Sequence, residues 1–399
     1  MGSTRTSPTR RLRRPSHIPR VAVLVDTSTS WGRRLHAGIH SYDRKHGPWQ
    51  LFVEPRGLEE KLRVPPGWQG DGIIARVGSV AMAQELEALR VPVVNVSGIQ
   101  LSGVSFPQVT TNLDASARLA ARHFIERGFK HFAYFSLIGL SYVAVHQKAF
   151  ADSIAEADGD FALLAVKPRA GAEPDWNLDL AKLGNWLKSL PKPVGILTWN
   201  PSSAREIIYA CQVAGLLVPE EVAVLSGSDD ELLCDLLQVP ISGILVPAES
   251  IGLEAAQLLD QLMRGHTAPK QAGVIAPSGV ATRQSTDTLA ISDAALVKAM
   301  SFIRQNAAQP IQVADVSRQS GVSRRVLERR FMDVLGRTPA AEIRRVHLER
   351  AKQLLAETDM PIPEVADAAG FGSPEYLAFV FRQEVNTTPR KFRQDMRHQ

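Results

Sequence analysis

The sequence is poor in cysteine and contains no long apolar run. Its two cysteines, Cys211 and Cys234, lie in largely apolar surroundings. This excludes a disulfide framework and a cysteine-based zinc site, and it fits a reducing compartment. No apolar stretch approaches the roughly 18 residues of a membrane-spanning helix, and the run Val21 to Val25 is too short for an export signal. We therefore predict a cytoplasmic protein with no membrane partner.

Sequence patterns of catalysis are also missing. The chain has no phosphate-binding loop, no cluster of metal ligands and no nucleophile elbow. An alkyl-transfer DNA-repair enzyme would need an activated cysteine in a polar setting, whereas both cysteines are predicted to lie inside helices. A solute-binding protein for transport would need an export signal. We expect no enzyme activity, no metal and no cofactor.

Charge is distributed unevenly along the 399 residues, a length that suggests two or three domains. Residues 1–20 carry six arginines and no acid, and they are predicted to form a basic disordered tail, either merely solvated or touching DNA. Residues 21–294 hold 29 acidic and 23 basic side chains, whereas residues 295–399 hold 12 acidic and 17 basic. The C-terminal part therefore suits phosphate binding, and the acidic body has another task.

One pattern occurs twice near the C-terminus, about fifty residues apart. Each copy has a small residue for close helix approach, a glycine for a left-handed helix end, a serine to cap the next helix, and a leucine–phenylalanine pair that faces the core. These are Ser317, Gly321, Ser323, Leu327 and Phe331 in the first copy, and Ala366, Gly370, Ser373, Leu377 and Phe381 in the second. The pattern predicts two helix-turn-helix motifs, joined by the amphipathic segment Ala340–Thr358.

The helix after each turn has a face left free to enter a major groove. In the first copy Arg325 and Arg329 can grip guanine, and Glu328 can accept from cytosine. The second copy offers Glu375, Tyr376 and Phe379, which favour apolar contact with thymine methyls or shape readout. Arginines and lysines at the flanks of both helices are predicted to meet phosphates: Arg324, Arg330, Arg382, Lys391 and Arg393.

The repeated stretches resemble the AraC/XylS-type DNA-binding domain over residues 297–395. The resemblance rests on Ser323–Phe331, Glu349–Leu355, Ile362–Ala366, Gly370–Tyr376 and Thr388–Arg393. It implies that double-stranded operator DNA is the partner, and for an activator RNA polymerase as well. The alternative is an all-helical packing module that binds no nucleic acid.

Ahead of this module, short β-rich runs alternate with helical stretches, which predicts parallel sheets covered on both faces and arranged in two lobes. The predicted strands are Val21–Val25, Gly72–Ala75, Val91–Val96, His131–Phe135, Gly195–Thr198 and Val222–Ser226. The predicted helices are Ala81–Leu89, Ala115–Arg127, Leu178–Leu190, Ala204–Ala214 and Ile251–Met263. We assign residues 21–283 to this α/β domain and 284–296 to a linker.

The α/β part resembles the periplasmic-binding-protein-like effector domain of LacI/GalR-type regulators. Asp71–Ile74, Pro92–Val94, Thr111–Phe124, Arg127–Phe129 and Gly227–Asp230 carry this resemblance. With an AraC-type reader behind it, the chain resembles the xylose-operon activators of the AraC family. The resemblance implies a homodimer, and a small-molecule effector bound between the lobes at the carboxyl ends of the strands.

The same resemblance implies which residues hold the effector. Arg33 and Asp229 match the charged anchors of the family, and Trp31 can stack on a sugar ring. Asn112, His146 and Asn200 stand where the family usually has ionic groups. A sugar such as a pentose is therefore expected, with another small polar metabolite or a degenerate, empty cleft as alternatives.

Overall fold

The fold is described here from a computed structural model. It covers residues 18–53, 62–137, 141–166, 176–269, 271–290 and 293–397. Most of the predicted basic tail, residues 1–17, lies outside the described residues. Within the described part, no helix is both long and apolar enough to cross a membrane.

The first lobe is built on a four-stranded parallel sheet in the order β2-β1-β3-β4. Its elements are β1 (Arg20–Leu24), α1 (Ser30–His46), β2 (Gln50–Val53), β3 (Gly72–Ala75), α2 (Val80–Glu87) and β4 (Val93–Asn95). Alternate residues of β1 face opposite sides of the sheet. Val21 and Val23 pack with α1 and a returning helix, α8 (Ala248–Met263), whereas Ala22 and Leu24 pack with α2.

The second lobe has six strands in the order β12-β10-β9-β8-β6-β7, all parallel except β12. Helices α3 and α4 cover one face and α5 and α6 the other. The elements are α3 (Leu113–Ile125), β6 (His131–Leu137), α4 (Ser141–Ala155), β7 (Asp160–Val166), α5 (Trp176–Ser189), β8 (Val194–Thr198), α6 (Pro201–Ala214), β9 (Val222–Ser226), α7 (Glu231–Asp235), β10 (Ser242–Ile244) and β12 (Val280–Ala281).

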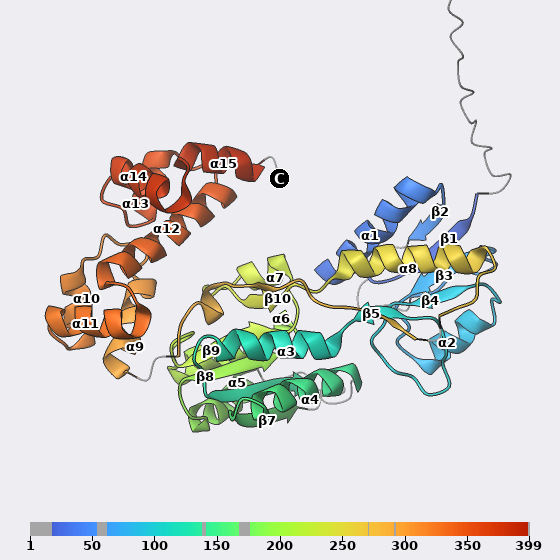
Figure 1. The fold of residues 1–399 in the computed structure, drawn as a ribbon, viewed down its shortest axis with the longest axis horizontal. Coiled ribbons are helices and arrows are strands. Elements are labelled where there is room, and N and C mark those ends of the chain that lie inside the picture. Colours follow the sequence, from blue (N-terminus) through green and yellow to red (C-terminus); the bar gives the residue numbers. More distant parts are fainter. Residues whose placement is uncertain are drawn as a thin grey trace, which may run out of the picture.

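The lobes are joined by three crossings of the chain (Figure 1). The first runs through β5 (Val109–Thr111) into α3, the second leads from β10 into α8, and the third returns through β11 (Gly273–Ile275) to β12. Strands β5 and β11 pair in parallel with each other. The carboxyl ends of both parallel sheets therefore meet at the boundary between the lobes, where ligands of such folds bind.

A helical domain follows and is drawn in orange and red in Figure 1. It contains α9 (Ala294–Gln305), α10 (Val313–Ser320), α11 (Arg324–Leu335), α12 (Pro339–Glu357), α13 (Ile362–Ala368), α14 (Pro374–Val385) and α15 (Pro389–Arg397). Two separate cores form, one around α9–α11 and one around α13–α15. Ile343 of α12 belongs to the first core and Ala351 to the second, so one unbroken helix supports both.

The predicted two-lobed α/β domain and tandem helix-turn-helix module are both confirmed, with element ends shifted by a few residues. Gly321 and Gly370 have the predicted left-handed backbone, with φ of 73° each. Ser373 accepts a hydrogen bond from the Tyr376 N–H, but the side chain of Ser323 makes no cap bond, so that detail was wrong. Sequence reasoning also missed α1, α4 and β7.

Candidate DNA-reading helices and effector site

The first reading helix, α11, carries two exposed arginines, Arg325 and Arg329. Leu327, Phe331 and Leu335 are buried in the core, which turns Arg325 and Arg329 to solvent. The carboxylate of Glu328 already has a protein partner, because the Nε of Arg324 donates to its Oε1 at 2.9 Å. Arg325 and Arg329 are therefore the groups of α11 best placed to reach guanine edges.

Two of the expected phosphate ligands are tied to the protein instead. The Nη1 of Arg330 donates to both carboxylate oxygens of Asp293, at 2.7 and 2.8 Å, and Asp293 also caps α9. The Nη2 of Arg393 donates to the carbonyl of Met360 at 2.6 Å. These contacts fix α11 on α9 and α15 on the loop between α12 and α13, which gives both arginines a structural role.

The second reading helix, α14, presents a different surface. Ser373 caps it, Leu377 and Phe381 are buried, and Glu375, Tyr376 and Phe379 face solvent. Exposed cations lie at the end of α14 and at the start of α15: Arg382, Arg390 and Lys391. Helix α14 thus presents two exposed rings and Glu375, and three exposed cations lie nearby in the chain.

At the boundary between the lobes, side chains from both lobes form a group that we call the interlobe cluster. It consists of Asp26, Trp31, Arg76, Tyr142 and Trp199. The Nη1 of Arg76 lies 3.7 Å from the Oδ2 of Asp26, and its guanidinium sits over the Trp31 ring, 5.8 Å from the centroid. Across the boundary, Arg76 lies near enough to Tyr142 for its charge to act on the phenol, and the Tyr142 ring lies 4.9 Å from that of Trp199. Burial raises the pKa of Tyr142 despite the opposing effect of this cation.

Asp26 is the least satisfied member of the cluster. Its Oδ1 accepts from the Thr29 hydroxyl at 2.8 Å, but its buried Oδ2 accepts no hydrogen bond from the described residues. A buried carboxylate oxygen left without a donor is costly, so it marks a place for a missing hydrogen-bond donor. Sequence reasoning missed Asp26 and Arg76, although Asp26 follows the apolar run Val21–Val25 and Arg76 directly follows β3.

Asp229, a predicted anchor, is held by protein partners. Its Oδ1 accepts from Arg283 at 2.6 Å, and Arg34 lies 3.6 Å from its Oδ2. The adjacent Asp230 accepts from the Ser30 N–H at 3.0 Å and so ties the start of α1 to the second lobe. Asp229 and Arg34 therefore lie at the lobe contact, beside the interlobe cluster.

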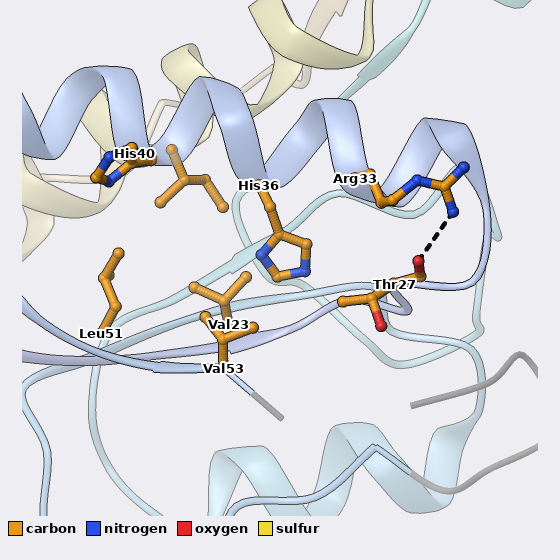
Figure 2. Close-up of a pocket in the computed structure, with 8 residues that line it drawn as sticks. Val23, Thr27, Arg33, His36, His40, Leu51 and Val53 are labelled. Atoms are coloured by element: carbon orange, nitrogen blue, oxygen red, sulfur yellow. Dashed lines mark hydrogen bonds between the residues drawn. The ribbon is translucent and has the colours of Figure 1, made fainter. Parts of the chain in front are cut away.

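Arg33, the other predicted charged anchor, is bound to backbone carbonyls before α1. Its Nη1 donates to the carbonyls of Thr27 and Ser28 at 3.1 and 2.8 Å, and it borders a hollow of about 350 Å³ between α1 and the strands β1 and β2. Figure 2 shows His36 and His40 along the same side of α1, above Val23, Leu51 and Val53. In the part of the chain that the structure describes, no hydrogen bond or salt bridge joins Arg33 to Asp229, although the charge of Arg33 acts on the neighbouring Asp230.

The remaining predicted effector ligands also have protein partners. Asn112 caps α3 and Asn200 caps α6, each through its Oδ1. His146 is fully buried, with one ring nitrogen 2.9 Å from the Tyr134 hydroxyl and the other 3.2 Å from that of Ser116. Burial lowers the pKa of His146 to about 4, so its imidazole is neutral. Trp31 is the predicted ligand that belongs to the interlobe cluster.

The α/β body is joined to the helical domain by ion pairs, which we call the junction. Arg304 of α9 pairs with Glu220, which precedes β9, and also donates to the carbonyl of Asp287. The carboxylate of Asp287 accepts from Arg345 of α12 at 2.7 Å. The buried Glu342 pairs with Arg345 as well; burial alone would raise its pKa, but the hydrogen bond and charge of Arg345 hold it lower. The junction therefore fixes α9 and α12 on the effector domain.

Comparison with known proteins matches these parts in order. Residues 20–113 match the family described as XylR N-terminal domain, residues 121–286 a periplasmic binding protein-like domain, and residues 316–395 a helix-turn-helix domain. A xylose operon regulatory protein of Escherichia coli K12 is 30% identical over 383 residues, which is 94% of this chain and 96% of the relative. The one of Haemophilus influenzae is 28% identical, with 94% and 98% covered.

A solved structure, that of the xylose-binding transcription activator xylR, is similar over nearly its full length. It superposes with a TM-score of 0.79 at 29% identity and covers 95% of this chain and 98% of that one.

Proposed function

Because the chain belongs to the family of the xylose operon regulatory proteins, DNA-binding transcription regulators with an AraC-type reader and a periplasmic-binding-protein-like domain, we propose that it senses a neutral sugar at the interlobe cluster. The observation that carries this proposal is the buried Oδ2 of Asp26, which lacks a donor at the carboxyl end of β1. A sugar hydroxyl would supply that donor, and the rings of Trp31 and Trp199 offer apolar faces for the sugar carbons.

The chemistry of the cluster favours a polyhydroxy compound over a charged one. The carboxylate of Asp26 and the guanidinium of Arg76 balance each other in charge. Outside the cluster, Asn112 and Asn200 each accept a helix-cap bond through Oδ1. The names of the relatives make xylose the first compound to test. Another small polar metabolite is the second candidate, favoured by the absence of a contact between Arg33 and Asp229.

The proposal includes action as a homodimer in the cytoplasm, with operator DNA and RNA polymerase as partners. It assigns no catalysis. Burial raises the pKa of Cys211 and of Cys234 to about 12, so neither thiol ionises near neutral pH.

Replacing Asp26 by Asn should weaken effector binding by at least tenfold, because a charged hydrogen bond contributes roughly 1.5–3 kcal/mol. Calorimetric titration of the full-length protein with pentoses, hexoses and polyols would measure this. Asp114→Asn, an exposed change on α3, is the matched control and should leave affinity unchanged. Asp229→Asn and Arg33→Ala test the anchors predicted from the sequence. If Arg33→Ala abolished binding while Asp26→Asn did not, the effector site would lie at the α1 hollow.

Replacing Arg325 or Arg329 by Ala should cost roughly 1–3 kcal/mol on the preferred operator and relax base preference at single positions. Arg382→Ala should instead weaken binding about equally on every sequence, since a phosphate contact carries no base information. Fluorescence anisotropy against a set of single-base-pair operator variants separates these outcomes. Altered base preference in Arg382→Ala, with none in Arg325→Ala, would exchange the roles.

A further inference from the structure

The two helix-turn-helix units correspond residue by residue at an offset of fifty from Ser323 and Ser373 onward. Reading helices α11 and α14 each contain 12 residues, and each ends on a left-handed residue, Gly336 with φ 64° and Asn386 with φ 56°. A Thr-Pro pair then starts the following helix in both units. Positions fifty apart therefore occupy equivalent places on the two helices.

At the equivalent outward positions the helices differ in chemistry. Where α11 presents Arg329, α14 presents Phe379, whose side chain is 56% exposed. Tyr376, 43% exposed, stacks on Phe379 with centroids 6.4 Å apart and ring planes 15° apart. Leu377, Val380 and Phe381 fill the core beneath. The ring of Tyr376 also lies edge-on to Phe371 of this core, with centroids 5.9 Å apart, so Phe379 is the ring that contributes least to the core. Leaving such rings in water is unfavourable, which indicates that a partner covers them.

The border of this aromatic pair indicates the partner. Arg382 lies one turn after Phe379, Arg390 and Lys391 start α15, and Glu375 lies one turn before Phe379; all four are exposed, so positive charge is in excess. A partner that fits must carry apolar groups within a frame of negative charge. The major groove meets this requirement where thymines occur, because each thymine projects a C5-methyl group between two phosphate backbones.

We propose that Tyr376 and Phe379 read thymine C5-methyl groups in the major groove, so that the half-site under α14 is specified by methyl contacts and the half-site under α11 by guanine. This inference rests on the proposed placement of both helices in the groove. Its consequence is an operator whose two halves differ in composition. Sequence recognition by α14 then depends on a group that has no part in base pairing.

The test removes methyl groups from DNA without changing its pairing. Full-length protein first selects its operator from a random duplex pool, and each thymine of that operator is then replaced singly by deoxyuridine. Affinity should fall about fourfold per methyl at one or two thymines under α14. In Phe379→Ala the effect should disappear at the thymine that Phe379 contacts. For the wild-type protein, 5-bromodeoxyuridine, similar in size to thymine, should restore the affinity lost with deoxyuridine.

Met332→Ala provides the matched control, because Met332 is an exposed apolar residue on α11. This variant should keep the full deoxyuridine effect. The inference is overturned if deoxyuridine is neutral at every thymine, or if Phe379→Ala leaves DNA affinity unchanged while transcription with purified RNA polymerase is lost. If the protein selects no sequence at all, the proposed placement of the reading helices fails rather than the methyl readout.

Discussion

Affinity for operator DNA should fall about 150-fold for each bound protomer when monovalent salt is raised from 50 to 200 mM. Each phosphate contact contributes about −0.9 to the slope of the logarithm of the binding constant against the logarithm of the salt concentration. Four exposed cations around the reading helices are candidates for these contacts: Arg324, Arg382, Arg390 and Lys391. They predict a slope of roughly −3.6 per protomer. A salt titration of binding, followed by fluorescence anisotropy, measures it.

The same titration separates phosphate contacts from structural arginines. Arg382→Ala and Lys391→Ala should each make the slope shallower by about 0.9. Arg330→Ala should leave the slope unchanged, since Asp293 already holds that guanidinium. A nearly flat salt response of the wild type, or a shallower slope in Arg330→Ala alone, would contradict the assignment.

Replacing Glu220 by Gln should lower the free energy of unfolding by about 3–5 kcal/mol, because it leaves a buried cation without its counter-ion. Glu220 is 1% and Arg304 6% exposed at the side chain. Urea unfolding followed by circular dichroism measures the loss, and limited proteolysis between residues 287 and 296 reports whether the junction opens.

Two further variants serve as controls for the Glu220→Gln variant. Lys148→Ala breaks an exposed pair with Asp152 and should cost no more than about 1 kcal/mol. Replacing Glu220 and Arg304 together by Leu should recover most of the stability, because no unpaired charge stays buried. Equal losses in the Glu220→Gln and Lys148→Ala variants would show that the junction pair is not buried in solution.

The helical domain could be predicted closely because its information is local. The glycines and the Leu–Phe spacing define each helix-turn-helix within a short stretch of chain, and Gly321 and Gly370 have the predicted backbone. The β-rich runs were equally readable, since buried parallel strands are continuously apolar. By contrast, β7 is half-exposed, and α1 alternates small and charged residues that hide its buried face.

The candidate effector site was less predictable because it depends on contacts between distant segments. Arg33 and Arg34 are neighbours in sequence, yet consecutive residues of a helix point about 100° apart. Arg34 reaches Asp229, whereas Arg33 returns to the carbonyls before α1. The role of Arg33 stays a prediction. Nothing local could have indicated that Arg304 pairs with Glu220, 84 residues earlier.

The unbroken helix α12 constrains how the promoters of this regulator can evolve. Its 19 residues span about 28 Å and carry a reading unit at each end, close to the ~34 Å that separates half-sites one helical turn apart. A base substitution within a half-site removes one contact and can be compensated by another. An inserted base pair between the half-sites rotates the second by roughly 35° and displaces the whole second unit at once. Operators in the genome should therefore drift in sequence while insertions and deletions in the spacer are eliminated.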